Sequence, residues 1–134
     1  ADAEFDEVFP SETYTILKST VLDDFSSSYF IQNKDFTFHK KQLPSEVQMS
    51  PIMAIENVDG KLILGGNLYG IDPNWGQQEA GRPTVLEYIN GNFEVVKRFE
   101  GINGEIRQIL ESGEKIFITR NNAKSVVIDK NQIN

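Results

Sequence analysis

The chain offers few side chains for catalysis. His39 is the only histidine among 134 residues, and cysteine is absent. A Ser-His-Asp or Cys-His catalytic set needs a histidine placed against a nucleophile, and zinc sites need several histidine or thiolate ligands. Because His39 falls in a predicted strand, we expect it to be an exposed or hydrogen-bonded strand residue. We expect neither an enzyme nor a zinc site.

Carboxylates occur in pairs, but nothing in the sequence places a pair across a cleft. Asp23 and Asp24 end a predicted helix, and Glu111 and Glu114 flank a predicted hairpin turn. Glycoside hydrolysis needs two carboxylates about 5 to 10 Å apart, on either side of the bond that breaks. We therefore expect these acids to lie on the solvated surface.

Two adjacent glycines, Gly65 and Gly66, resemble the start of a phosphate-binding loop. The resemblance is weak because no Gly-Lys-Ser/Thr motif and no helix follow them. We expect the glycines to serve backbone geometry instead. Asn67, which follows them, is then predicted to adopt a left-handed conformation.

The segment from Gly65 to Pro83 is predicted to be a long loop, and loops above roughly 12 residues are usually functional or disordered. It combines the only tryptophan with amides and one arginine. Such residues suit sugar or peptide recognition, and Trp, Tyr and Arg are favoured at protein interfaces. The alternative is that Trp75 and Tyr69 fold back and cover the end of a sheet. The candidate binding residues are Asn67, Tyr69, Asp72, Asn74, Trp75, Gln77, Gln78 and Arg82.

The elements that must position these residues repeat along the chain. Residues 52–67 align without a gap to residues 106–121, an offset of 54, and each copy predicts a strand, a tight turn and a second strand. A shorter repeat relates residues 33–38 to 90–95 at an offset of 57. Periods in this range are typical of stacked β units, most often propeller blades. Such units bury their apolar faces only against their neighbours. The matched residues include Ile52 and Ile106, Ile55 and Ile109, Lys61 and Lys115, and Asn67 and Asn121.

Residues 1–25 are predicted to form an acidic lead-in and a short amphipathic helix over residues 11–24. Tyr14, Leu17, Val21, Leu22 and Phe25 fall on one face at helical spacing. Alternating apolar patterns and turn residues then predict nine strands. Those strands cover residues 29–32, 36–39, 52–56, 61–64, 84–89, 93–96, 105–110, 115–119 and 125–128.

The strands group into a partial blade at 26–42, a full blade at 52–97 and a terminal blade at 104–129, all within residues 26–134. Nine strands are too few for a closed ring, which needs at least four four-stranded blades. The sequence therefore predicts an all-β, incomplete β-propeller of about two to three four-stranded antiparallel blades, with the N-terminal helix beside it. An open stack exposes strand edges and apolar faces, which invites association.

The composition narrows the choice of partners. Hydrophobic residues make up 39% of the chain, which indicates a globular protein. The formal charge is −7, and the 13 basic residues are scattered, which argues against nucleic acid and anionic membrane surfaces as partners. No stretch approaches the roughly 18 apolar residues of a membrane helix. The start at Ala1 fits a removed signal peptide and equally a boundary within a longer chain.

Three segments carry a family resemblance. They are residues 27–33 (SSYFIQN), residues 43–52 (LPSEVQMSPI) and residues 62–70 (LILGGNLYG). In this order they resemble the last blades of FG-GAP/VCBS-repeat β-propeller proteins, which are common in Bacteroidetes. Residues 105–109 and 119–122 resemble the closing blade of that family. The resemblance covers about residues 26–129, and the Gly-Gly-Asn-x-Tyr segment is its most specific part.

The resemblance implies a secreted protein, located outside the cell, on the outer cell surface or in the periplasm. It implies adhesion, ligand capture or assembly rather than catalysis. The chain departs from the family in one respect: related repeats often carry a calcium loop of the form Asp-x-Asp-x-Asp-Gly. Calcium needs six to eight oxygen ligands, and neither residues 56–61 nor residues 110–114 supply that set. We expect no calcium site and no cofactor.

These observations favour a non-catalytic protein-interaction or assembly module at the cell surface. It would dock a partner chain or the rest of a longer propeller through its open edges and the 65–83 loop. The alternative is a glycan- or peptide-binding module that uses the 65–83 loop, with Trp75 and Tyr69 as its platform.

Overall fold

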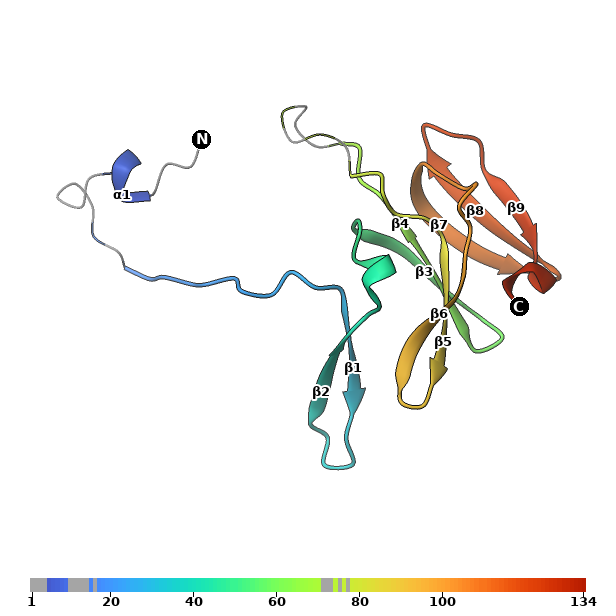
Figure 1. The fold of residues 1–134 in the computed structure, drawn as a ribbon, viewed down its shortest axis with the longest axis horizontal. Coiled ribbons are helices and arrows are strands. Elements are labelled where there is room, and N and C mark those ends of the chain that lie inside the picture. Colours follow the sequence, from blue (N-terminus) through green and yellow to red (C-terminus); the bar gives the residue numbers. More distant parts are fainter. Residues whose placement is uncertain (1–4, 10–14, 16, 71–73, 75, 77) are drawn as a thin grey trace.

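The computed structural model describes residues 5–9, 15, 17–70, 74, 76 and 78–134. In this part the protein is all-β, with three antiparallel sheets that follow one another in chain order (Figure 1). The first sheet has two strands, the second four and the third three. The strands are β1 (Ser28–Gln32), β2 (Phe38–Gln42), β3 (Ile52–Val58), β4 (Lys61–Gly66), β5 (Thr84–Ile89), β6 (Asn92–Arg98), β7 (Glu105–Ser112), β8 (Lys115–Asn121) and β9 (Val126–Asp129).

Short helical turns complete the described elements: α1 (Phe5–Val8), η2 (Ser45–Val47) and η4 (Lys130–Ile133). Each of the nine strands overlaps one of the nine strands predicted from the sequence. The tight turns also follow the prediction. Asp59-Gly60 and Asn90-Gly91 have positive φ at both positions, 51° and 84° in the first pair and 50° and 87° in the second. These values fit the type I′ turns that twisted hairpins favour.

The sequence repeat is also a repeat of strand register. Ile52 pairs with Gly66 and Ala54 with Gly65, so one extra residue, Met53, bulges out of β3. Fifty-four residues later, Ile106 pairs with Arg120 and Gln108 with Thr119, which leaves a bulge at Arg107 in β7. A bulge bends and twists its strand. Its recurrence at the same place means that the β3–β4 and β7–β8 hairpins share one local design.

The main core lies between the second and third sheets, where β7 lies against β3 and β4. Ile63 and Val85 of the second sheet are fully buried in it, as are Ile116 and Ile118 of the third sheet. The opposite face of the second sheet forms a smaller cluster around Leu64 and Leu86, which Val47 of η2 helps to cover. The second sheet is therefore apolar on both faces, as expected of a sheet inside a stack.

Polar contacts join the second and third sheets at the turn end. Lys130, in η4, forms ion pairs with Glu111 of β7 (Nζ–Oε1 2.6 Å) and with Asp59 of the β3–β4 turn (Nζ–Oδ2 3.0 Å). Glu111 N–H also donates to Glu56 Oε1 at 3.2 Å. The first sheet contacts β6 more lightly, since Tyr29 meets the Phe93 ring edge-on at 4.9 Å between centroids.

The predicted helix over residues 11–24 is wrong where the structure describes it. Residues 17–27 run without regular structure, residues 11–14 and 16 lie outside the described part, and the helical turn α1 comes earlier. An amphipathic helix of this length depends on burying its apolar face. Here Leu17 is 95% exposed and Phe25 is 84% exposed. Asp24 instead accepts hydrogen bonds from Ser26 and pairs with Lys40.

Candidate functional site

Asn67, the first candidate binding residue, is a fully buried structural residue at the end of β4. Its φ of 90° is left-handed, as predicted. Its side-chain Nδ2 donates to the carbonyl oxygens of Gly81 (3.1 Å) and Gly104 (2.9 Å), and its Oδ1 accepts from the Gly81 N–H at 2.8 Å. This side-chain amide thus joins the end of β4 to two other parts of the chain. One is residues 78–83, the returning arm of the loop, and the other is the residue that precedes β7. Both Nδ2 hydrogens are used and the side chain is fully buried, so a ligand in solution would not reach it.

Tyr69 is held against the third sheet through Glu105. The Tyr69 N–H donates to Glu105 Oε1 (3.2 Å), and Asn121 Nδ2 donates to Glu105 Oε2 (3.0 Å). Arg107 Nη2 contacts Oε1 of the same carboxylate at 2.6 Å. The Asn121 hydrogen bond, with help from Tyr69 and Arg107, lowers the pKa of Glu105 below its usual range. Burial, with the nearby Glu79 carboxylate, raises the pKa of Tyr69. This cluster fixes the base of the loop.

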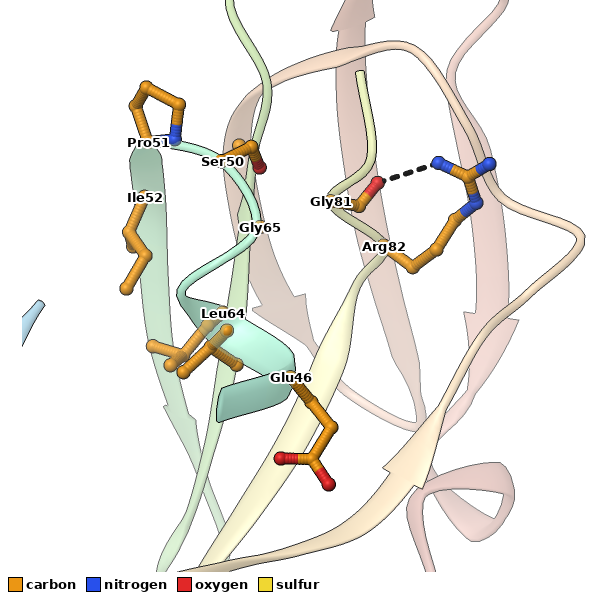
Figure 2. Close-up of a pocket in the computed structure, with 10 residues that line it drawn as sticks. Glu46, Ser50, Pro51, Ile52, Leu64, Gly65, Gly81 and Arg82 are labelled. Atoms are coloured by element: carbon orange, nitrogen blue, oxygen red, sulfur yellow. Dashed lines mark hydrogen bonds between the residues drawn. The ribbon is translucent and has the colours of Figure 1, made fainter. Parts of the chain in front are cut away.

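Arg82 also serves the loop's own backbone. Its Nη1 donates to the Gly81 carbonyl oxygen at 2.8 Å (Figure 2). It also donates to the Glu79 carbonyl oxygen at 2.8 Å. Arg98 Nη2 donates to the Ala80 carbonyl at 3.1 Å, so two guanidinium groups hold the same short segment. Gln78 and Leu68 form an isolated β-bridge that closes the arm. Asn74 is exposed, and Asp72, Trp75 and Gln77 lie outside the described residues.

The hollow beside this arm is small. It lies between the connector that precedes β3 and the glycines of β4, with Ser50, Gly66, Gly81 and Arg82 among its lining residues (Figure 2). Its volume of about 10 Å³ is the space of a single water. A Cβ on Gly66 would lie 1.7 Å from the Pro51 carbonyl oxygen, so this glycine is required by the close approach of the two backbones.

Two larger hollows are open grooves that flank η2. One, of about 500 Å³, runs between Leu43, Pro44 and β6. The other, of about 410 Å³, is lined by Phe25, Met49 and Gln78 among others. Polar side chains line both, among them Glu46 and Glu94 in the first and Gln48 in the second, but both are open, whereas a small-ligand pocket buries most of its ligand.

Catalytic groups are dispersed across the described part of the chain. His39 is exposed in β2, where it pairs across the sheet with Ile31. Glu111 is engaged by Lys130, and Asp24 by Lys40 and Ser26, so these acids hold the fold together. No three acidic or histidine side chains among the described residues gather closely enough to hold a metal ion.

The feature that sequence reasoning missed is an apolar row on the outer face of the third sheet. Leu110 pairs with Phe117, and Phe117 pairs with Val127, so the three side chains share one face. They are 48%, 37% and 51% exposed. Their neighbours Ile109, Ile116, Ile118 and Ile128 point the other way, into the main core.

The repeat shows what this row corresponds to. In the second sheet the same positions are Glu56, Ile63 and Val85, which also pair directly across the strands. Ile63 and Val85 are fully buried against the third sheet. Equivalent residues are therefore covered in one sheet and open in the next. The sequence alignment at an offset of 54 residues matches Ile63 with Phe117, but it does not show which of the two faces lacks a neighbour.

Ile55 and Ile109 give the same relation from the other side. Ile55, on the opposite face of the second sheet, is 59% exposed, whereas its counterpart Ile109 is buried in the main core. Both sheets thus turn equivalent faces the same way along the stack. The outer face of the third sheet, and the part of the second sheet around Ile55, therefore correspond to faces that contact another sheet elsewhere in the molecule.

Comparison of the chain with protein-family models, with curated proteins and with solved structures found no match. Within the described residues, no helix has the length and apolar character that crossing a lipid bilayer requires.

Proposed function

We propose that this chain is a non-catalytic protein-interaction or assembly module, whose sheets are units of a larger stack. A partner chain, or further units of a longer propeller, would cover the outer face of the third sheet. The observation that carries this proposal is the exposed row of Leu110, Phe117 and Val127. Two of its three counterparts in the second sheet, Ile63 and Val85, bury their side chains against a neighbouring sheet.

The proposal includes the propeller interpretation and its cell-surface setting. Three sheets succeed one another in chain order, and the second and third turn equivalent faces the same way, as successive blades would. The resemblance to FG-GAP/VCBS-repeat proteins supports the same interpretation and a secreted location. An enzymatic role has little support, because Glu105 is bonded to Asn121 and Tyr69, and Glu111 to Lys130, in contacts that join different parts of the fold.

Light scattering on the 134-residue chain over a range of concentrations tests the proposal, together with the binding of a dye that reports exposed apolar surface. We expect self-association or strong dye binding. A double variant, Phe117→Ser with Val127→Thr, should reduce both signals. The matched control Leu17→Ser removes an exposed apolar side chain outside the row and should reduce them less. A monomer that binds no dye would refute the proposal.

The alternative, a glycan- or peptide-binding module, draws support from the firm base of the 65–83 loop. Asn67, Arg82 and the Leu68–Gln78 bridge fix both ends of the arm, which is how a scaffold presents a recognition loop. Trp75 is the only tryptophan, so its fluorescence reports on the loop directly. Quenching or a spectral shift with one member of an oligosaccharide or peptide panel would favour this alternative, and an unchanged spectrum with all members would count against it.

A further inference from the structure

The larger of the two open grooves lies between two parts of the chain that are distant in sequence. One wall is the end of β2 with the start of η2, and the other is the first half of β6. Within the described chain β6 pairs only with β5, so it is an edge strand of the second sheet. The groove has a volume of about 500 Å³, and residues 42–46 and 92–95 line it.

The groove has a firm apolar lining. Leu43, Phe93 and Val95 are half-buried and pack against the smaller core cluster around Leu64 and Leu86. The Phe93 ring also meets two tyrosine rings edge-on, with 4.9 and 5.2 Å between ring centroids. Because these contacts belong to the core of the second sheet, the groove presents its apolar surface without rearrangement, which lowers the cost of binding.

The backbone of β6 has unpaired groups along the same wall. The two-residue turn Asn90-Gly91 brings Ile89 and Asn92 together as the first hydrogen-bonded pair of the hairpin. Bonded and non-bonded pairs then alternate along an antiparallel ladder. Phe93 and Val95 therefore direct their N–H and C=O groups away from β5. In the described part of the chain no group bonds to them, and the bulge that follows in β6 limits this edge to a short stretch.

The charges of the groove have one sign. Glu46 lies on one wall and Glu94 on the other, and both are exposed. Within the described residues neither carboxylate forms an ion pair, and no lysine or arginine lines the groove. Lys41, at one end, is bonded to the Gly91 carbonyl (2.7 Å) and to Asn92 Oδ1 (3.0 Å). In a chain of formal charge −7, charge complementarity favours a cationic occupant.

The strand register strengthens this preference. Glu94 lies directly opposite Glu87 in the β5–β6 ladder, and like charges in that position destabilise a sheet. Lys61 approaches Glu87 only to 3.8 Å. A cation placed beside Glu94 on the free side of β6 would relieve the repulsion.

We propose that this groove binds a short extended peptide in which apolar side chains alternate with lysine or arginine. The peptide backbone pairs with the outward groups of Phe93 and Val95. Because side chains alternate between the faces of a strand, its apolar side chains lie beside Phe93 and Val95 on one face. Its cationic side chains then lie beside Glu94 on the other face, and Glu46 on the opposite wall attracts a further cation.

The backbone pattern is what identifies the occupant as a peptide. Unpaired N–H and C=O groups at every second residue, about 7 Å apart, match an extended backbone, whereas a free amine would use only the carboxylates. The exposed segment of the same chain over residues 17–25 ends beside Asp23 and Asp24, so its charge has the wrong sign. The inference goes beyond the proposed function, because the groove is separate from the row of Leu110, Phe117 and Val127.

The test is an NMR titration of the full chain with a peptide of alternating valine and lysine, about eight residues long. We expect amide shifts concentrated in residues 42–46 and 92–95. At saturation the Phe93 and Val95 amides should exchange with solvent at least tenfold more slowly. A valine–glutamate peptide of the same length should bind at least tenfold more weakly.

Matched controls separate the groove from general attraction between opposite charges. The double variant Glu46→Gln with Glu94→Gln should weaken binding about fivefold, as expected for two exposed ion pairs. Asp23→Asn with Glu114→Gln makes the same change in net charge at exposed positions outside the groove and should leave binding nearly unchanged. A valine–lysine peptide N-methylated at alternate residues lacks the donors that β6 needs and should protect neither amide.

Four outcomes would overturn the inference. They are shifts spread over the whole chain, equal binding of the valine–glutamate peptide, equal losses in the two double variants, and equal protection by the N-methylated peptide. Slow exchange of the Phe93 and Val95 amides without peptide, lost on dilution, would also overturn it by identifying a second copy as the occupant. Because light scattering and dye binding report on the third sheet and this titration on the second, each proposal can fail without the other.

Discussion

Replacing Asn67 with alanine should destabilise the fold far more than its place in a loop motif suggests. The side chain makes three hydrogen bonds, two to carbonyl oxygens and one from the Gly81 N–H. The Gly81 carbonyl keeps its bond from Arg82, so two groups, the Gly104 carbonyl and the Gly81 N–H, lose their partner. Each such loss costs about 1 kcal/mol at the low end of the usual range. An alanine at a φ of 90° adds about 1 kcal/mol of backbone strain. We therefore expect a loss of about 3 kcal/mol.

That loss is a large share of the roughly 5 to 15 kcal/mol that stabilises a typical domain. At this chain length it should lower the melting temperature by about 9 °C, from roughly 3 °C per kcal/mol. Urea denaturation with linear extrapolation measures the free energy directly. Asn67→Gly separates the terms, because it relieves the strain and loses the same hydrogen bonds, so it should cost about 1 kcal/mol less.

The matched control is Asn121→Ala, since Asn121 occupies the same place in the repeat. Asn121 is exposed and makes one side-chain bond, to Glu105, so its loss should be clearly smaller. If the two alanine variants lose similar stability, the structural role assigned to Asn67 is wrong. If Asn67→Ala keeps its stability and loses binding of a ligand, Asn67 belongs to a recognition site.

Three further predictions concern the stack and its charges. Ile63→Ala should cost about 2 to 5 kcal/mol, and Phe117→Ala, at the equivalent exposed position, should cost less in the same urea titration; equal losses would contradict the assigned faces. The pKa of Glu105 lies below its usual 4.5, so its stabilising contribution is present above that pH and is lost as the pH falls through the lower, folded value. Glu105→Gln should flatten the stability profile there, and an unchanged acid limb would refute the role. Glu111, followed by Asp59, raises the pKa of Lys130 above its usual 10.5, so that contribution is present below pH 10.5 and disappears as the pH rises through the folded value. Lys130→Met should remove this alkaline loss, and an alkaline limb identical to that of the wild type would argue against the ion pairs.

The hairpins could be predicted from the sequence because a hairpin depends on neighbouring residues in the chain. Asp59-Gly60 and Asn90-Gly91 can adopt positive φ at low cost, and apolar alternation on either side sets the strands. The left-handed Asn67 also followed from residue type alone. The prediction of a helix over residues 11–24 was wrong because the spacing of apolar residues alone does not stabilise a helix. The apolar face must also pack against another part of the protein. Leu17 and Phe25 are exposed in the described structure.

The candidate site was only partly accessible from sequence for a related reason. Amide and guanidinium groups often bind ligands, so residue type alone indicates Asn67 and Arg82 as binding residues. Their partners, the Gly104 carbonyl and the Glu79 carbonyl, became visible only in three dimensions. Similarly, the repeat matched Ile63 with Phe117 without showing that one faces a sheet and the other faces solvent. Residue type records what a side chain can bind, and the fold decides what it does bind.

The outer face of the third sheet has a consequence for engineering. In repeat arrays, soluble ends are made by capping units whose outward surface is polar. The last sheet of this chain has the opposite character, with an aromatic ring between two aliphatic side chains. Serine or threonine in place of Leu110, Phe117 and Val127 would make this sheet resemble a capping unit. A chain with these substitutions should stay monomeric.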